Sequence, residues 1–108
     1  MTPQPGDATA MTAMSAMSDR RDWVGPVLLA GPGADCVIAA IRELNASVEV
    51  IDRGSYLRVW CPRRCRVTRE ALERHRGAPF NLPVDLESVM TSFKGRLSMS
   101  DQEACWDA

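Results

Sequence analysis

The sequence predicts an α+β domain in which helices pack on one face of small, mostly antiparallel sheets. Residues 34–44 and 81–89 carry apolar side chains at the spacing of a helix with one buried face. Residues 47–52 and 56–60 instead alternate apolar and polar side chains, as half-buried strands do. The predicted order is strand, helix, strand, strand, short strand, helix, helix, strand and strand. That order describes one β-α-β-β motif followed by a second.

The length of 108 residues allows one domain at most, with a modest core and no deep substrate cavity. Residues 1–22 are rich in methionine, alanine and threonine, and we expect a flexible tail there, ahead of a folded domain at residues 23–108. The net charge of −1 gives no general attraction to nucleic acid or to an anionic membrane. No stretch approaches the ~20 apolar residues of a membrane span, and no secretory signal is recognisable, so we expect a cytoplasmic protein.

The first predicted strand, at residues 23–30, is interrupted by Gly25-Pro26. Proline cannot donate a hydrogen bond to a neighbouring strand, so this strand should begin at a sheet edge or at a bulge. Residues 31–33 form a turn before the helix predicted at residues 34–44, and Cys36 falls on the apolar face of that helix as a small core residue. The buried stripe of the helix consists of Val37, Ala40, Ile41 and Leu44.

Residues 53–55 (Arg-Gly-Ser) separate the two alternating segments and are typical of a hairpin turn. Residues 61–64 turn the chain again, and residues 65–67 form a short strand. Two further strands are predicted near the end of the chain, at residues 96–99 and 102–106.

Two short helices follow the hairpin. Thr68 caps the first, Glu70 lies in its first turn where the helix dipole favours an anion, and Gly77 ends it in a left-handed conformation. Asn81 caps the second helix, with Pro83 in its first turn. The apolar face of the second helix is formed by Leu82, Leu86 and Val89. The segment at residues 90–96 fits neither a helix nor a strand, and we expect a contact surface there.

The chain offers few groups for chemistry. Its only histidine, His75, lies on an arginine-rich helix with no serine or cysteine beside it, so a nucleophile–base pair is not predicted. Cys61 and Cys65 form C-x-x-x-C, which matches neither the zinc-knuckle nor the redox C-x-x-C spacing, and all four cysteines are expected to be reduced thiols. Phosphate-loop, dinucleotide-binding and H-E-x-x-H motifs are absent from the sequence. We therefore expect no catalytic residue, no cofactor and no bound metal ion.

Arginine is concentrated in residues 53–76, whereas the chain from Val84 onward is acidic. This distribution suggests a docking surface with polarity, although a solvated arginine-rich hairpin would show the same pattern. An alternative is a small nucleic-acid-binding module that uses this hairpin, because Tyr56, Arg58 and Trp60 share one strand face on which bases could stack. The Gly-flanked aromatic motif of RNA-recognition sheets is absent. A small-molecule-sensing domain is a third hypothesis.

Four blocks stand out in order along the chain: V-G-P-V, I-D-R-G-S-Y-L-R, T-R-E-A-L-E-R-H-R-G-A-P-F-N and T-S-F-K-G-R-L. Together they resemble the effector (coupling, or regulatory) proteins of soluble di-iron monooxygenases, and the likeness spans Trp23 to about Met99. These small components accompany methane, phenol, toluene and alkene or isoprene hydroxylases. The sequence is most similar to the toluene and alkene/isoprene branch.

The resemblance implies a cofactor-free, non-catalytic protein of two β-α-β-β motifs, distantly ferredoxin-like and monomeric when free. It also implies docking on the α subunit of a di-iron hydroxylase near the active-site entrance, where ferredoxin or reductase would compete. Docking would tune O2 activation, substrate access and electron coupling. The predicted contact residues are Met90, Thr91, Ser92, Phe93, Lys94, Gly95, Arg96, Tyr56 and Arg58. Phe93 would either anchor the partner or tuck under its own loop.

Overall fold

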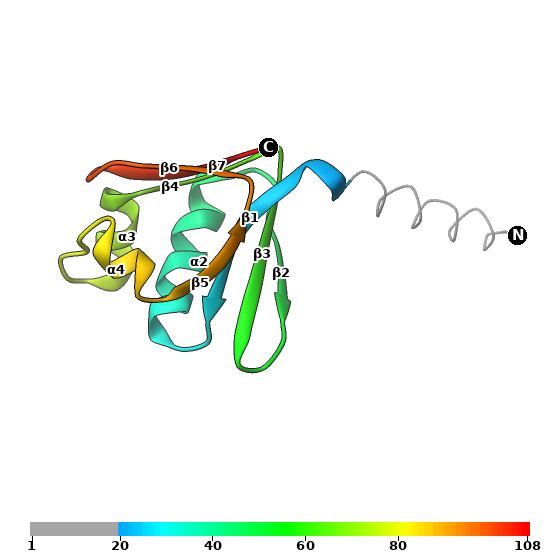
Figure 1. The fold of residues 1–108 in the computed structure, drawn as a ribbon. Helices are drawn as coiled ribbons and strands as arrows, with labels where there is room; N and C mark the ends of the chain where they lie inside the picture. Colours follow the sequence, from blue (N-terminus) through cyan, green and yellow to red (C-terminus); the bar gives the residue numbers. More distant parts are fainter. Residues whose placement is uncertain (1–19) are drawn as a thin grey trace, which may run out of the picture.

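The computed structural model describes residues 20–108, and most of the tail predicted for residues 1–22 lies outside the described residues. Within the described part, a 3-10 turn, η1 (Arg20–Asp22), leads into seven strands and three helices (Figure 1). The strands are β1 (Trp23–Leu29), β2 (Glu49–Asp52), β3 (Tyr56–Pro62), β4 (Arg64–Thr68), β5 (Met90–Lys94), β6 (Arg96–Met99) and β7 (Glu103–Asp107). The helices are α2 (Pro32–Leu44), α3 (Arg69–Arg76) and α4 (Val84–Glu87).

Two antiparallel sheets organise the fold, one with strand order β2-β3-β1-β5 and one with order β4-β7-β6. The predicted α+β class with small antiparallel sheets is therefore confirmed. The first motif is β1-α2-β2-β3, as predicted. The second motif is longer than predicted because it contains an additional strand, β5, which pairs with β1 of the first motif. This crossover joins the two halves of the chain.

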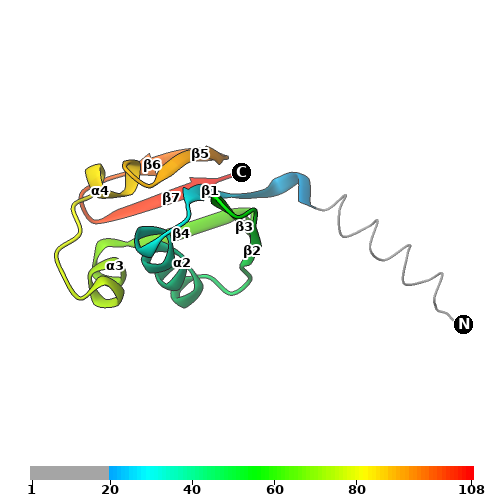
Figure 2. The same ribbon diagram turned by 90° about the horizontal axis from the view of Figure 1, so that it is seen from below.

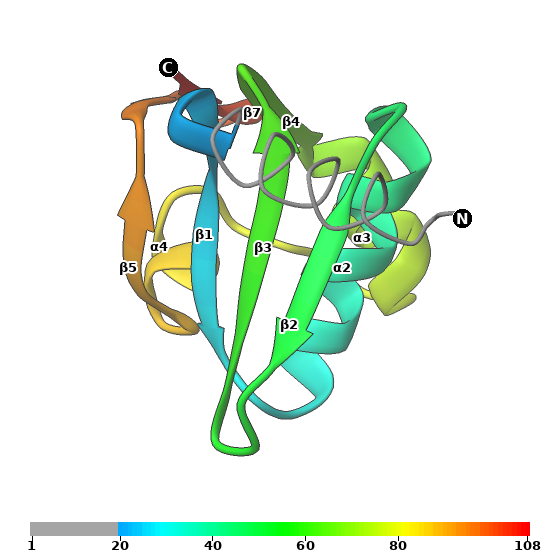
Figure 3. The ribbon, with the colours of Figure 1, turned by 90° about the vertical axis from the view of Figure 1, so that its right-hand side faces the viewer.

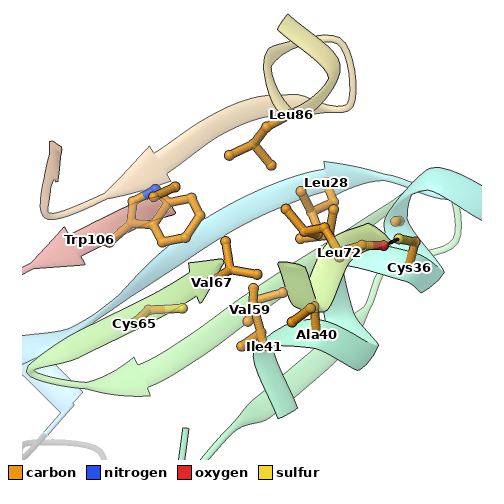
Figure 4. Close-up of a cluster of buried hydrophobic side chains, with 14 of the residues drawn as sticks. Leu28, Cys36, Ala40, Ile41, Val59, Cys65, Val67, Leu72, Leu86 and Trp106 are labelled. Atoms are coloured by element: carbon orange, nitrogen blue, oxygen red, sulfur yellow. Dashed lines mark hydrogen bonds between the residues drawn. The ribbon is translucent and has the colours of Figure 1, made fainter. Parts of the chain in front are cut away.

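Helix α2 lies behind the four-stranded sheet, and Figure 2 shows α2 and α3 side by side. The predicted stripe of α2 is buried at Val37, Ala40 and Ile41, and Leu44 is half-buried. The thiol of Cys36 donates a hydrogen bond to the carbonyl oxygen of Leu72 at 3.3 Å and thereby links the two helices. The resulting core brings together side chains from both sheets and from all three helices (Figure 4).

Strand β1 lies in the interior of its sheet, between β3 and β5, so the predicted sheet-edge position is wrong. Pro26 coincides with a gap in the pairing of β1 with β3, so its missing N–H interrupts no regular ladder on that side. The residues of β1 that pair with β3 lie on either side of Gly25-Pro26, and the pairing with β5 shifts register after Val27. Gly25, with φ 147, passes so close to β3 that an added Cβ would lie 2.4 Å from the carbonyl oxygen of Val59. A register shift does occur in β1, but it lies after Val27 against β5 and not at Gly25-Pro26, so the predicted bulge at the start of the strand is not found either.

Helix α3 begins and ends at the predicted residues. The hydroxyl of Thr68 accepts a hydrogen bond from the N–H of Ala71 at 3.2 Å and so caps the first turn. Gly77 adopts φ 71, and its N–H donates to the carbonyl oxygen of Glu73 at 2.8 Å. Both signals are local, which explains why the sequence predicts them.

Helix α4 is shorter than predicted. It begins after Pro83, and Val89 lies beyond its end. Asn81 does not cap it with its side chain; instead, the carboxylate of Asp85 accepts the N–H of Asn81 at 2.8 Å. Asp85, a residue of the helix, therefore fixes the backbone that precedes the helix. The helix itself is a single turn, and its Leu86 is buried.

The segment Met90–Arg96 also differs from the prediction of irregular structure. Met90–Lys94 is strand β5, Gly95 is a bend with φ 108, and Arg96 begins β6. Strand β5 exists because β1 supplies its hydrogen-bond partner, with Ser92 opposite Val27. A pairing between residues so distant in sequence leaves no local pattern near residue 90.

The predicted final strand is confirmed as β7, which is the central strand of the three-stranded sheet. It pairs with β4 on one side and β6 on the other. Its Trp106 is fully buried against the core (Figure 4). The end of the chain is therefore part of the scaffold.

Candidate functional site

The open face of the four-stranded sheet is the strongest candidate for a functional surface. Helix α2 covers the back of this sheet, while none of the described helices covers its front (Figure 3). Pairing of β1 with β3 places Leu29 beside Tyr56 and Val27 beside Arg58. On the other side of β1, Ser92 of β5 lies opposite Val27. Three strands that are distant in sequence thus contribute to one surface.

A shallow hollow of about 350 Å³ lies on this open face. Two of its side chains, Leu29 and Tyr56, are neighbours and are 47% and 39% exposed. Adjacent exposed apolar groups with polar groups around them are typical of protein interaction sites. The hollow is lined by Val27, Leu29, Ser55, Tyr56, Arg58, Thr91 and Ser92.

Trp60 organises the charged part of the open face. The Cζ atom of Arg58 lies 4.6 Å from the centroid of the Trp60 ring, and the Nζ atom of Lys94 lies 5.4 Å from it. Both distances are within the range at which an aromatic ring attracts a cation. Lys94 pairs with Gly25, which has no side chain to obstruct its path across β1. Its Nζ also donates to the carbonyl oxygen of Arg21 at 2.8 Å, so the ring and the backbone together fix this cation.

The structure brings some of the predicted contact residues together on this face. Tyr56, Arg58 and Ser92 line the hollow, and Lys94 lies over the neighbouring ring. Thr91 is the extra residue at the register shift of β5, and its hydroxyl donates to the carbonyl oxygen of Val27 at 3.4 Å. Their role in binding stays a prediction.

The remaining predicted contact residues lie elsewhere. Met90 is half-buried and packs against the core. Phe93 is 44% exposed and does not tuck fully under its strand. Gly95 forms the bend between the two sheets, and Arg96 begins a strand of the second sheet. The prediction treats residues 90–96 as one loop, whereas the structure divides them between two sheets.

Sequence reasoning omits Val27, Leu29 and Ser55 from the site. Apolar residues in a predicted strand are expected to be buried, so Val27 and Leu29 look like core residues. Val27 is indeed only 6% exposed, but Leu29 is the last residue of β1 and reaches solvent. The position of Leu29 beside the exposed Tyr56 is visible only after the strands are paired.

The arginine-rich stretch 53–76 does not form a continuous basic surface. Six of its eight arginines form ion pairs with carboxylates. Two of these pairs join β4 to the acidic end of the chain, at 3.3 Å and 2.9 Å. The predicted separation between a basic middle and an acidic end of the chain is therefore largely neutralised by ion pairs in the folded protein. The pairs are Arg63–Asp22, Arg64–Asp107, Arg66–Glu103, Arg69–Glu73, Arg74–Glu43 and Arg76–Asp85.

All four cysteines are free and buried, in agreement with the predicted thiols. Cys61 and Cys65 are hydrogen-bonded to each other, which lowers the pKa of Cys61. The same hydrogen bond and burial raise the pKa of Cys65 well above its usual range. Cys105 accepts a hydrogen bond from Nε of Arg64 at 2.9 Å. These thiols lie away from the open face and pack within the scaffold.

His75 borders a second hollow, of about 500 Å³, on the helix side of the molecule. Its Nε2 lies 2.8 Å from Oε1 of Glu43, and this hydrogen bond is the main reason why the pKa of Glu43 is lowered. Arg76 in the same hollow is paired with Asp85 at 3.2 Å. Because these polar groups engage one another, we interpret the hollow as a crevice between helices.

Residues 20–108 contain neither a cluster of metal-binding side chains nor a membrane-spanning helix. No group of three or more histidine, cysteine, aspartate or glutamate side chains in this range is arranged to hold a metal ion. None of the helices in the same range combines the length and apolarity that a membrane crossing requires.

Comparison with known proteins places the chain among regulatory components of oxygenases. The model of the MmoB/DmpM family matches residues 22–107. One relative is the effector subunit of the alkene monooxygenase system of Xanthobacter autotrophicus (strain ATCC BAA-1158 / Py2). It is 47% identical over 85 residues, which cover 77% of this chain and 83% of the relative.

Solved structures share the fold. A chain from the complex of phenol hydroxylase with its regulatory protein superimposes with a TM-score of 0.73 at 17% identity, covering 80% of this chain and 98% of that one. The regulatory protein B of soluble methane monooxygenase gives a TM-score of 0.62 at 19% identity, covering 99% and 88% of the two chains. At such identities the likeness concerns the fold.

Proposed function

The chain belongs to the MmoB/DmpM family, and from that premise we propose that it is the effector component of a multicomponent di-iron hydrocarbon monooxygenase. It acts without catalytic residues of its own, by docking on the α subunit of the hydroxylase near the active-site entrance. The observation that carries this proposal is the 47% identity to the effector subunit of an alkene monooxygenase system. We place the protein in the cytoplasm together with its hydroxylase.

We propose the open sheet face and strand β5 as the docking surface. Leu29 and Tyr56 supply adjacent exposed apolar anchors, and Phe93 supplies a third at the sheet edge. Tyrosine and arginine are enriched among the residues that carry most of the binding energy at interfaces, and Tyr56 and Arg58 supply both types on this face. Thr91 and Ser92 have small side chains at the rim of the hollow, so a partner can approach the strand closely.

An effector changes the rate of another protein only by binding its conformations with different affinities. Docking at the active-site entrance favours a hydroxylase conformation in which O2 activation, substrate access and electron delivery are coordinated. A coupling free energy of ~1–3 kcal/mol corresponds to rate or affinity changes of roughly 5–150-fold. Strand β5 suits this role because its hydrogen bonds to the interior strand β1 hold the rim residues in fixed positions. Ferredoxin or reductase would compete for the same region.

The test is to titrate the hydroxylase, in the presence of its ferredoxin and reductase, with this protein while measuring turnover. The wild-type protein should raise turnover to an optimum at a fixed ratio to the hydroxylase. The double variant Leu29→Ala/Tyr56→Ala should need roughly tenfold more protein, because truncating anchor residues costs more than ~1 kcal/mol of binding free energy. Val84→Ala is the matched control, since Val84 is 64% exposed on α4 outside the open face.

Turnover that stays flat across the wild-type titration would contradict the proposed function. If the folded double variant titrates like Val84→Ala, the function stands and the docking surface lies elsewhere. The alternative of a nucleic-acid-binding module has less support, because most arginines in residues 53–76 are already paired with carboxylates.

A further inference from the structure

The ion pairs of this protein leave a small set of cations without a carboxylate partner among the described residues. An exposed ion pair presents little net charge to its surroundings, so these other cations determine the attraction to a partner. They are Arg21, Arg42, Arg53, Arg58, Lys94 and Arg96.

Four of these cations lie on the four-stranded sheet or at its ends. Arg58, of the interior strand β3, and Lys94, the last residue of the edge strand β5, both lie against the ring of Trp60. Arg21 lies in η1, where its carbonyl oxygen receives Nζ of Lys94. Arg53 lies in the turn between β2 and β3. The strand pairing thus gathers cations from three separate parts of the chain.

The exposed carboxylates are distributed differently. On the sheet itself, both carboxylates belong to the edge strand β2: half-buried Glu49 lies opposite Trp60, and exposed Asp52 lies opposite Leu57. Four other exposed carboxylates lie on the helix side or in a distant turn. These are Asp35 on α2, Glu70 on α3, Glu87 on α4 and Asp101 between β6 and β7.

We propose that the hydroxylase surface covering the open face is acidic where it meets Arg58 and Lys94, and that this charge complementarity accelerates docking. The inference rests on the proposed function and adds the chemistry of the partner surface. An acidic patch of Asp and Glu side chains, placed beside an apolar contact for Leu29 and Tyr56, is the complement that this face requires.

The geometry around Trp60 prepares the two cations for such a partner. A guanidinium that stacks on an aromatic face keeps its N–H edge available for bidentate bonds to a carboxylate, and the Cζ atom of Arg58 lies 4.6 Å from the centroid of the Trp60 ring. Lys94 uses one of its three N–H donors on the carbonyl oxygen of Arg21 and retains the others. Side chains that are already held in place lose less conformational entropy when they bind. The ring therefore makes both cations more effective than freely moving ones.

The experiment is a rapid-mixing measurement of association between the full-length protein and the hydroxylase at low and high sodium chloride. The wild-type association rate should fall roughly tenfold as the salt screens the attraction. The double variant Arg58→Gln/Lys94→Gln should associate roughly tenfold more slowly at low salt and lose most of its salt dependence. Arg58→Lys/Lys94→Arg keeps both charges and should keep the salt dependence.

Arg42→Gln is the matched control, because Arg42 is also an exposed cation without a carboxylate partner among the described residues, but it lies on α2. It should associate at the wild-type rate. Circular dichroism and thermal unfolding establish that each variant is folded before its rate is compared.

Three outcomes would overturn the inference about charge without contradicting the proposed function. One is a wild-type association rate that does not respond to salt. Another is an Arg42→Gln variant that slows association as much as the double variant. The third is binding of a single-stranded oligonucleotide as tightly as the hydroxylase at the same salt, which would assign the face to nucleic acid. A wild-type protein that neither binds nor stimulates the hydroxylase at any salt would instead contradict the proposed function.

Discussion

Replacing Gly95 with alanine tests whether the bend between β5 and β6 is required by the structure itself. Gly95 has φ 108, a conformation that residues with a Cβ atom rarely adopt. An added Cβ would lie 2.8 Å from Cγ1 of Val24 and 2.9 Å from the carbonyl oxygen of Asp107. Val24 is buried in an interior strand, and Asp107 belongs to the central strand of the other sheet. Neither atom can move away without disturbing a sheet.

The expected loss of stability combines two costs. Backbone strain at a positive φ costs about 1–2 kcal/mol, and forcing a methyl group into a packed site costs about 1–3 kcal/mol. We therefore expect Gly95→Ala to lower the free energy of unfolding by about 3 kcal/mol. In a domain of this size, that corresponds to a decrease in Tm of roughly 12–24 °C.

Urea unfolding followed by circular dichroism measures this difference directly. Gly54→Ala is the matched control, because Gly54 has φ 87 but no atom lies within 4 Å of its added Cβ. The control carries the strain without the clash and should lose only about 1 kcal/mol. Equal free energies of unfolding for Gly95→Ala and Gly54→Ala would refute the packing argument.

Two other predictions concern local features of α3. Thr68→Ala removes the hydroxyl that accepts the N–H of Ala71, and thermal unfolding should show a loss of about 1 kcal/mol that Thr68→Ser largely restores. A loss of the same size in Thr68→Ser would contradict the capping role. The hydrogen bond from the N–H of Phe80, together with Arg69, lowers the pKa of Glu73 below its usual 4.5. The folded protein thus binds this proton less readily than the unfolded chain, so the stabilisation is present above about pH 4.5 and is lost as the pH falls through the folded pKa. Glu73→Gln should weaken this acid dependence in urea unfolding, and an unchanged dependence would exclude the assignment.

Features that depend on neighbouring residues follow from the sequence. The spacing of Val37, Ala40 and Ile41 predicts the buried face of α2, and Arg53-Gly54-Ser55 predicts the hairpin. The cap at Thr68 and the left-handed Gly77 are also predicted, because each involves atoms within a few residues. The four sequence blocks that resemble effector proteins likewise point to the family that the comparisons find.

Features that depend on residues distant in the chain cannot be predicted from the sequence in the same way. Strand β5 owes its existence to β1, and nothing near residue 90 indicates which strand it will join. The ion pair between Arg66 and Glu103 cancels charges that stand far apart in the chain. Pro26 favours a strand at a sheet edge, but the interior position is possible because the pairing of β1 with β3 is interrupted at Gly25-Pro26.

By itself, the sequence determined the class of fold, most of the helices and strands, the family and the absence of recognisable catalytic motifs. Only the tertiary structure decided that β1, β3 and β5 would join into one open face, with Leu29 beside Tyr56 and two cations on the ring of Trp60. The reason is that local patterns record each residue's preference for a helix, strand or turn, whereas a surface is set by which strands pair and in what register. Register is a property of two distant segments, and it appears only when the whole core is packed.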